Sequence, residues 1–155
     1  MTMTLTLAIM LTLPQSHLDR DETPEQRAAL IKPWADGIDA VSRNAFDRAA
    51  LVAIAWHESG GFARYVLEHR CSDGPRGAKE CDSGHARGAF QVHPWCKATT
   101  VEGEAQCAAS AYRFALSRCG DNVSAFGQYA SGNACRPMPQ REKTRLMVLR
   151  RMGDS

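Results

Sequence analysis

Several patterns that mark common classes of protein are missing from this sequence. It has no Cys-x-x-Cys pair, no internal repeat and no low-complexity tract. Its formal net charge is only +2, which is too small for the basic surface that nucleic-acid-binding domains usually present. The N-terminal apolar stretch, residues 5–13, is too short to cross a membrane as a helix. We therefore expect neither a nucleic-acid partner nor a membrane span.

Two catalytic motifs are present only in part. His57-Glu58 begins like the His-Glu-x-x-His motif of zinc metalloproteases, but the last position is Gly61, so the second histidine ligand is missing. Ser59 and Ser83 lack the Gly-x-Ser-x-Gly context of a nucleophilic serine. The sequence argues against a zinc protease and a serine hydrolase, and we expect no metal ion or other cofactor.

The length and composition fit one domain. The chain has 155 residues, of which 44% are hydrophobic, and this is enough to form a core. We interpret residues 1–22 as an N-terminal leader or tether and residues 23–153 as the domain. Residues 5–13 have the length of the apolar part of a signal peptide, but no Lys or Arg precedes them and no Ala-x-Ala site follows. Because Thr alternates with Leu in this stretch, a short strand is an equally good interpretation.

The cysteines predict a disulfide framework. Their even number favours three disulfides, and they are Cys71, Cys81, Cys96, Cys107, Cys119 and Cys135. A zinc site made of the first three and His85 is the alternative, but its spacings of 10, 4 and 11 residues match no standard finger or ribbon. Six cysteines allow more pairings than the sequence can choose among. Because disulfides persist outside the cytosol, we expect a secreted or periplasmic protein, or one released by cell lysis.

Helix signals occur along most of the domain. Thr23, Pro24 and Gln26 form a capping pattern that begins a helix, which Pro33 should end before a short helix over residues 34–42. Further helices are predicted over residues 46–58, 101–118, 122–131 and 140–152.

The segment between residues 64 and 96 differs from these helices. It is rich in glycine and lacks helical periodicity, so we expect loops or a small β-sheet there, with a Cys71–Cys81 bond closing one loop. The predicted fold is mainly α, or α+β, with a buried central helix and this disulfide-stapled insert. The last helix has a basic face that we interpret as a solvated surface. Its residues are Arg141, Lys143, Arg145, Arg150 and Arg151.

The strongest functional signal is Glu58. It stands two residues after eight consecutive apolar residues, 49–56, and just before Ser59-Gly60-Gly61. The apolar run predicts a helix buried on all sides, and the glycines predict its C-terminal end. A carboxyl group at that place loses hydration and lies near the negative end of the helix dipole, and both effects raise the pKa of a carboxyl group. Glu58 is therefore a candidate general acid, and a solvated glutamate that merely ends the helix is the alternative.

Two later segments strengthen this signal. The first contains Gly88-Ala89-Phe90-Gln91, and the second contains Tyr129-Ala130-Ser131-Gly132. Together with residues 55–62, they resemble the lysozyme-like lytic transglycosylase superfamily, which includes the goose-type lysozymes. In that family a helix ends in Glu-Ser, a Gly-Leu-Met-Gln-like turn follows, and a Tyr-Asn-Ala-Gly-like motif closes the site. The resemblance covers about residues 46–132, and it departs from the family at Ala89-Phe90 and Ala130-Ser131.

The resemblance implies roles for particular residues. Glu58 would be the catalytic acid, and Asp82 would correspond to the aspartate that positions water in goose-type lysozymes. Glycoside hydrolysis usually needs a second carboxyl group of this kind, so Asp82 favours hydrolysis. Contacts to the substrate are implied for Ser59, Gly88, Gln91 and Tyr129.

The second carboxyl group has competitors within the same insert. Glu68, Asp73 and Glu80 lie near Asp82 in the sequence, and Asp82 could instead cap a turn beside Cys81.

The expected function is therefore that of a monomeric muramidase acting on the glycan strands of peptidoglycan. A lytic transglycosylase that forms 1,6-anhydro products, for example within a secretion or conjugation apparatus, is the nearest alternative. Chitin is an alternative substrate, because the acid mechanism does not need the lactyl group. A glycan-binding protein without catalytic activity is the alternative from another class.

Overall fold

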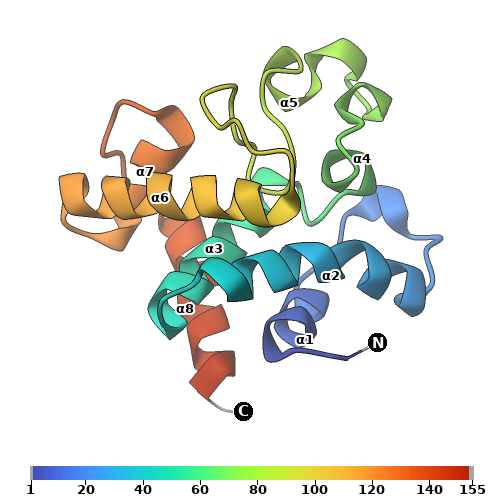
Figure 1. Ribbon diagram of the computed structural model, residues 1–155, viewed down its shortest axis with the longest axis horizontal. Helices are drawn as coiled ribbons and strands as arrows, with labels where there is room; N and C mark the ends of the chain where they lie inside the picture. Colours follow the sequence, from blue (N-terminus) through green and yellow to red (C-terminus); the bar gives the residue numbers. More distant parts are fainter. Residues whose placement is uncertain (1, 154–155) are drawn as a thin grey trace.

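The computed structural model describes residues 2–153 and is mainly helical, with a helix content of 66% (Figure 1). The described residues form the helices α1 (Leu5–Thr12), α2 (Pro24–Val41), α3 (Ala45–Glu58), α4 (Arg64–Leu67), α5 (Glu80–Ser83), α6 (Val101–Cys119), α7 (Asn122–Ser131) and α8 (Pro139–Gly153). Strand-like pairing in residues 2–153 is limited to one antiparallel bridge between Arg87 and Val92. The prediction of a mainly helical fold is confirmed, and the small β-sheet considered for the insert is not found in the described part of the chain.

Helix α3 forms the centre of the molecule, with α2, α6 and α8 around it (Figure 1). Asn44 caps its start, because the Asn44 side chain accepts a hydrogen bond from the backbone N–H of Asp47. Each residue from 49 to 55 is fully buried, as the unbroken apolar run predicts. The helix ends at Glu58, so this carboxyl group is fixed to the end of the most deeply buried element.

Helix α2 does not break at Pro33. The capping box at Thr23 and Gln26 is present as predicted, but one helix then continues to Val41, so the prediction of two helices is wrong. Proline inside a helix removes a backbone hydrogen bond. Ile31 and Trp34, on either side of Pro33, are both buried, and this packing outweighs the local preference of proline.

The N-terminal stretch is a helix, so the interpretation as a strand is wrong. Thr4 caps α1 by accepting a hydrogen bond from the N–H of Leu7. Leu7, Met10 and Leu13 are buried in the core. Their spacing of three residues follows the helical period, and it outweighs the alternation of Thr and Leu.

Residues 14–22, which the sequence presents as part of a leader or tether, are bonded to the rest of the domain. Trp56 donates its indole N–H to the carbonyl oxygen of Pro14 at 2.7 Å. Asp19 and Glu22 both form ion pairs with the buried Arg27 on α2, at 3.4 and 2.9 Å. These contacts hold the segment against α2 and the end of α3.

The last three long helices agree with the predicted ranges to within one residue at each end. Thr100 and Asp121 cap the starts of α6 and α7 through their side chains. Gly120 and Gly132 end the same helices in the left-handed conformation, with φ of 80° and 76°. Local sequence signals are therefore sufficient to place these helices.

Three disulfides join the described parts of the chain, as predicted. Cys71–Cys81 closes a loop in the insert, Cys96–Cys107 ties the end of the insert to α6, and Cys119–Cys135 ties the end of α6 to the loop after α7. The alternative zinc site is wrong, because three of its four proposed ligands are used in disulfides.

The insert lies on one side of the long helices, where α4, α5 and the loop up to residue 100 stand together (Figure 1). Its unusual feature is a left-handed turn formed by Cys81, Asp82 and Ser83, with φ of 51°, 51° and 56°. Each residue other than glycine costs about 1–2 kcal/mol in this conformation. Gly84 continues the turn with φ of 82°.

A search of the described residues for membrane-spanning segments finds no helix with the necessary length and apolar character.

Candidate active site

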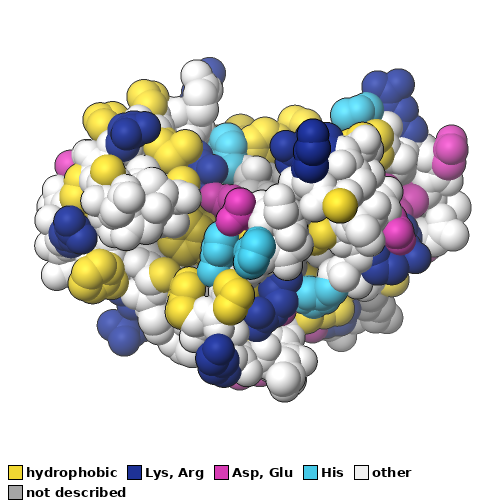
Figure 2. All heavy atoms as spheres, turned by 90° about the horizontal axis from the view of Figure 1, so that it is seen from above, with side chains coloured by type: hydrophobic (Ala, Val, Ile, Leu, Met, Phe, Trp, Pro, Cys, Tyr) yellow, Lys and Arg dark blue, Asp and Glu magenta, His cyan; other side chains and the backbone are white. Residues whose placement is uncertain are grey.

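One cavity of about 480 Å³ brings together four of the six residues selected from the sequence. Glu58, Asp82, Gln91 and Tyr129 line it, from the end of α3, from the insert and from α7. The other lining residues are Ala86, His93, Ala130 and Ser131. Figure 2 shows acidic and histidine side chains side by side near the middle of one face, between two lobes of the molecule.

Glu58 is largely enclosed, since its side chain is 17% exposed. Its Oε1 accepts a hydrogen bond from Nη1 of Arg141 on α8 at 2.5 Å, and the Arg141 side chain is only 12% exposed. Burial favours the protonated form of a carboxyl group, whereas a neighbouring cation favours the ionised form. Burial and the Arg141 cation therefore act on Glu58 in opposite directions.

The interpretation of the α8 basic face as a solvated surface is wrong for two of its members. Arg141 pairs with Glu58, and Arg145 is buried and forms a two-fold hydrogen bond with Glu142. Arg141, Arg145 and the buried Val148 are spaced by four and three residues along the helix, so they lie on one face. That spacing is the sequence signal by which Arg141 could have been found.

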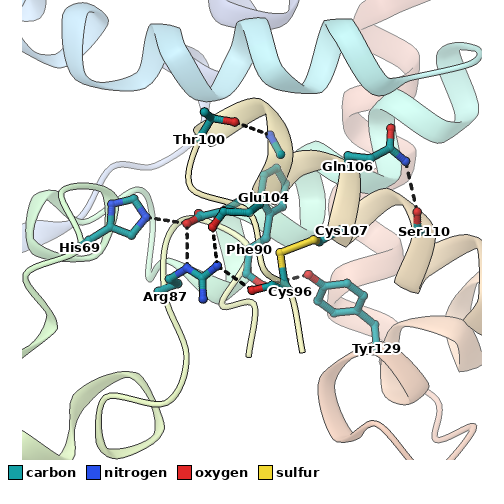
Figure 3. Close-up of a disulfide and its surroundings, with 12 residues drawn as sticks. His69, Arg87, Phe90, Cys96, Thr100, Glu104, Gln106, Cys107, Ser110 and Tyr129 are labelled. Atoms are coloured by element: carbon teal, nitrogen blue, oxygen red, sulfur yellow. Dashed lines mark hydrogen bonds and ion pairs between the residues drawn. A yellow bond between two sulfur atoms is a disulfide. The ribbon is translucent and has the colours of Figure 1, made fainter. Parts of the chain in front are cut away.

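Tyr129 connects α7 to the glycine-rich turn. Its hydroxyl group donates a hydrogen bond to the carbonyl oxygen of Phe90 at 2.8 Å (Figure 3). Burial raises the pKa of the Tyr129 phenol well above its ordinary value, and the nearby charge of Glu58 raises it further. The phenol therefore stays neutral and remains a donor at any pH at which the protein works.

Gln91 supports the loop rather than pointing freely into the cavity. Its side-chain Nε2 donates to the carbonyl oxygen of Gly88 at 3.1 Å and approaches Sγ of Cys81 at 3.5 Å. Its own backbone is left-handed, with φ of 49°. The Gln91 side chain therefore braces the loop in this structure.

Asp82 is the most exposed carboxylate of the cavity. Its side chain is 69% exposed, and its Oδ2 lies 3.8 Å from Nε2 of His93. The left-handed turn at residues 81–83 determines the direction in which the carboxylate points. Strained backbone of this kind often occurs at functional sites. His93 also lines the cavity, although it is not among the residues selected from the sequence.

Ser59 and Gly88 do not line the cavity. The hydroxyl group of Ser59 donates to the carbonyl oxygen of Ala55 and accepts from the backbone N–H of Phe62, so it shapes the turn after α3. Gly88 has φ of 69°, and a side chain there would overlap Glu104 and Trp34. Both residues are buried structural elements of the site's framework.

A buried carboxylate that the sequence did not reveal holds the turn in place. Glu104 on α6 accepts hydrogen bonds through Oε1 from Nε2 of His69 at 2.8 Å and from Nε of Arg87 at 3.1 Å (Figure 3). Arg87 also donates to the carbonyl oxygens of Cys96 and Ala98. The Cys96–Cys107 disulfide lies beside this network, so α6 and the turn are joined covalently and by ion pairs.

His57 lies next to Glu58 on α3 and is half-buried. Its Nε2 lies 2.9 Å from Oγ1 of Thr144 on α8. Burial, together with the charge of Arg141, lowers the pKa of His57 to about 4. His57 is therefore neutral at pH 7 and adds no charge to the site.

Within residues 2–153, no group of three or more His, Cys, Asp or Glu side chains is arranged to hold a metal ion. The polar side-chain groups of the cavity are two carboxylates, an amide, a phenol, a histidine and the hydroxyl group of a serine. This set can donate and accept protons and can form hydrogen bonds with a polyhydroxylated ligand.

Comparison of the chain with protein-family models, with curated proteins and with solved structures finds no match.

Proposed function

We propose that this protein is a muramidase that hydrolyses the β-1,4 bond between N-acetylmuramic acid and N-acetylglucosamine in peptidoglycan. The observation that carries the proposal is that Glu58, Asp82, Gln91 and Tyr129 line one cavity although they come from three separate segments. A cavity with convergent polar and titratable groups is the usual form of an enzyme site. Four of the six residues selected from the sequence are therefore close enough to act on one ligand.

The proposed reaction uses the two carboxyl groups in different roles. Glu58 in its protonated form donates its proton to the glycosidic oxygen, and the bond from this oxygen to C1 of the sugar breaks as positive charge develops on the ring. The oxygen of a water molecule then attacks C1, and Asp82 accepts a proton from that water. One water is consumed and a free reducing end is formed. Asp82 then releases its proton to solvent and Glu58 takes up one, which restores both groups.

The lysozyme-like architecture belongs to the same proposal. Its support is the buried helix α3 that ends at the proposed acid, with a disulfide-tied insert that supplies the second carboxylate. The three disulfides favour an oxidising compartment outside the cytosol, which is where peptidoglycan is found. We propose that the enzyme acts as a monomer.

A lytic transglycosylase is the second candidate, and the exposure of Asp82 favours it. Of the two carboxylates that line the cavity, Glu58 is 17% exposed and Asp82 is 69% exposed. In this reaction the 6-hydroxyl oxygen of the sugar attacks C1, and the Glu58 carboxylate takes the hydroxyl proton. No water is consumed, and the product is a 1,6-anhydro sugar. Such an enzyme could act within a secretion or conjugation apparatus.

Mass spectrometry of the products released from purified peptidoglycan tests both candidates. The samples are the wild type, Glu58→Gln, Asp82→Asn and, as a control, Glu102→Gln, which changes an exposed carboxyl group outside the cavity. Free reducing ends that disappear in the first two variants support the muramidase. Products lighter by one water that disappear only in Glu58→Gln support the transglycosylase. No release by the wild type contradicts both and leaves a glycan-binding protein.

A further inference from the structure

The ion pair between Glu58 and Arg141 presents a chemical conflict. A general acid must carry a proton before it reacts, but a cation in contact with a carboxyl group favours loss of that proton. Glu58 lines the cavity and Arg141 does not. The guanidinium therefore reaches the carboxylate from α8, without itself lining the cavity.

Arg141 is committed to this contact. Its Nη1 bonds to Oε1 of Glu58, and its Nε is buried without a hydrogen-bond partner among the described residues. A guanidinium enclosed in this way has exchanged its hydration for one carboxylate, and breaking the pair would leave a buried charge without compensation. This cost keeps the side chain of Glu58 in one orientation.

The other titratable groups around Glu58 do not oppose the charge of Arg141. On α3, His57 is neutral above about pH 5 because its pKa is lowered to about 4. On α7, Tyr129 is neutral because its pKa is raised. From the insert, Asp82 and His93 face the same cavity and lie 3.8 Å from each other. Arg141 is the cation that the described residues pair directly with Glu58.

We propose that Arg141 is a positioning residue that directs the Glu58 carboxyl group toward the cavity and determines the pH below which Glu58 holds the catalytic proton. This inference rests on the proposed function, since it assigns to Arg141 control of the acid in that reaction. The decline of activity toward alkaline pH is then governed by the ion pair.

The first test is the pH profile of kcat/KM on soluble peptidoglycan fragments. Arg141→Gln removes the charge and keeps a hydrogen-bond donor. We expect the alkaline limb of the profile to move to higher pH by about one unit or more, which is the usual effect of one adjacent charge. Arg141→Lys keeps the charge, so its alkaline limb should stay near that of the wild type.

Arg145→Gln is the matched control. Arg145 lies one turn further along α8 and pairs with Glu142 instead of Glu58, and its side chain is 7% exposed, against 12% for Arg141. Its loss should reduce the stability of α8 to a similar extent but leave the pH profile in place. A profile that moves equally in Arg141→Gln and Arg145→Gln, or that moves in neither, would overturn the proposal.

The second test does not need activity. Carbon-13 NMR of the Glu58 carboxyl group follows its protonation in the substrate-free protein, and we expect this titration to occur at higher pH in Arg141→Gln than in the wild type or Arg141→Lys. If the wild type cleaves no peptidoglycan, the proposed function fails, but this titration still shows whether Arg141 changes the pH at which Glu58 is protonated. If the wild type cleaves peptidoglycan and the titration does not move, the function stands and the role of Arg141 is refuted.

Discussion

At the scale of single residues, Tyr129 links the helix α7 to the turn that carries Gln91. Its phenol donates to the carbonyl oxygen of Phe90, and that oxygen belongs to buried backbone, where an unpaired acceptor is costly. We expect Tyr129→Phe to lower the free energy of unfolding by about 1–2 kcal/mol and to reduce kcat on peptidoglycan, because the turn beside Glu58 loses an anchor. Urea unfolding and product release measure the two effects.

Tyr65→Phe is the control for this substitution. The Tyr65 hydroxyl group donates to Glu80 at 3.2 Å, away from the cavity. A similar loss of stability with unchanged kcat is expected for it. Equal activity of the two variants would show that the Tyr129 contact serves stability alone.

A second residue-scale prediction concerns Gly88, whose role differs from the one that the sequence suggested. The family motif implies that its small size lets a sugar approach, but the structure buries it against Glu104 and Trp34. Gly88→Ala adds a methyl group to a filled space at positive φ, so we expect a loss of stability of about 2–4 kcal/mol. Thermal unfolding measures this loss.

Gly84→Ala separates the two causes of that loss. Gly84 also has positive φ, but a side chain there would meet nothing within 4 Å. Its substitution should cost only the strain of the left-handed backbone, about 1–2 kcal/mol. If Gly84→Ala is as destabilising as Gly88→Ala, crowding by Glu104 and Trp34 is not the reason for glycine at position 88.

At the scale of elements, the disulfide Cys71–Cys81 holds the turn that carries Asp82. In the variant with Cys71→Ser and Cys81→Ser, the cross-link no longer holds the turn in its left-handed conformation. Because this conformation is strained, we expect the turn to relax. If Asp82 activates water, hydrolysis should fall more than tenfold in this variant, because misplacement of a catalytic group by about 1 Å is sufficient for such a loss. Quantitative mass spectrometry of muropeptides checks the result.

Removal of Cys119–Cys135 by the same substitutions provides the comparison. The two disulfides span 10 and 16 residues, so each should contribute about 2–4 kcal/mol to stability. Of the two, only Cys71–Cys81 is adjacent to Asp82, the second carboxylate of the cavity. Equal losses of hydrolysis in the two variants would assign the effect to general instability and would remove the support for Asp82.

The elements also show which parts of the fold the sequence could predict. Helices α6 and α7 are predictable from the sequence, because their ends depend on local hydrogen bonds and backbone geometry at Thr100, Gly120, Asp121 and Gly132. The continuation of α2 through Pro33 could not be found in this way, since it depends on partners distant in the sequence. The same holds for the left-handed turn at residues 81–83, which begins at the disulfide-bonded Cys81.

The same distinction, between local sequence signals and partners distant in the sequence, applies to the residues of the candidate site. Glu58, Gln91 and Tyr129 belong to motifs that are continuous in the sequence, and all three line the cavity. Arg141 was missed because its contact with Glu58 depends on how α8 packs against α3. Glu104 was missed because a buried glutamate looks like any other in a helical sequence until its partners, His69 and Arg87, are placed around it.

At the scale of the whole molecule, the stability of the fold should depend on pH through His57. The pKa of His57 is about 4 in the folded protein, against 6.5 in a solvated histidine. Between these values the unfolded chain binds a proton that the folded protein does not bind, so acid favours unfolding in this window. From pH 7 to pH 5 we expect His57 to account for a loss of up to about 2 kcal/mol in the free energy of unfolding.

Urea unfolding of the wild type and His57→Gln at both pH values measures this contribution. Glutamine does not titrate and can keep a hydrogen bond to Thr144, so the difference in stability between pH 7 and pH 5 should shrink by about 2 kcal/mol in this variant. His17→Gln changes an exposed histidine and should leave that difference as in the wild type. An unchanged difference in His57→Gln would show that His57 is protonated in the folded protein at pH 5. If Glu58 is the proposed acid, its pairing with Arg141 on α8 restricts activity at high pH, and the neighbouring His57 on α3 restricts stability at low pH.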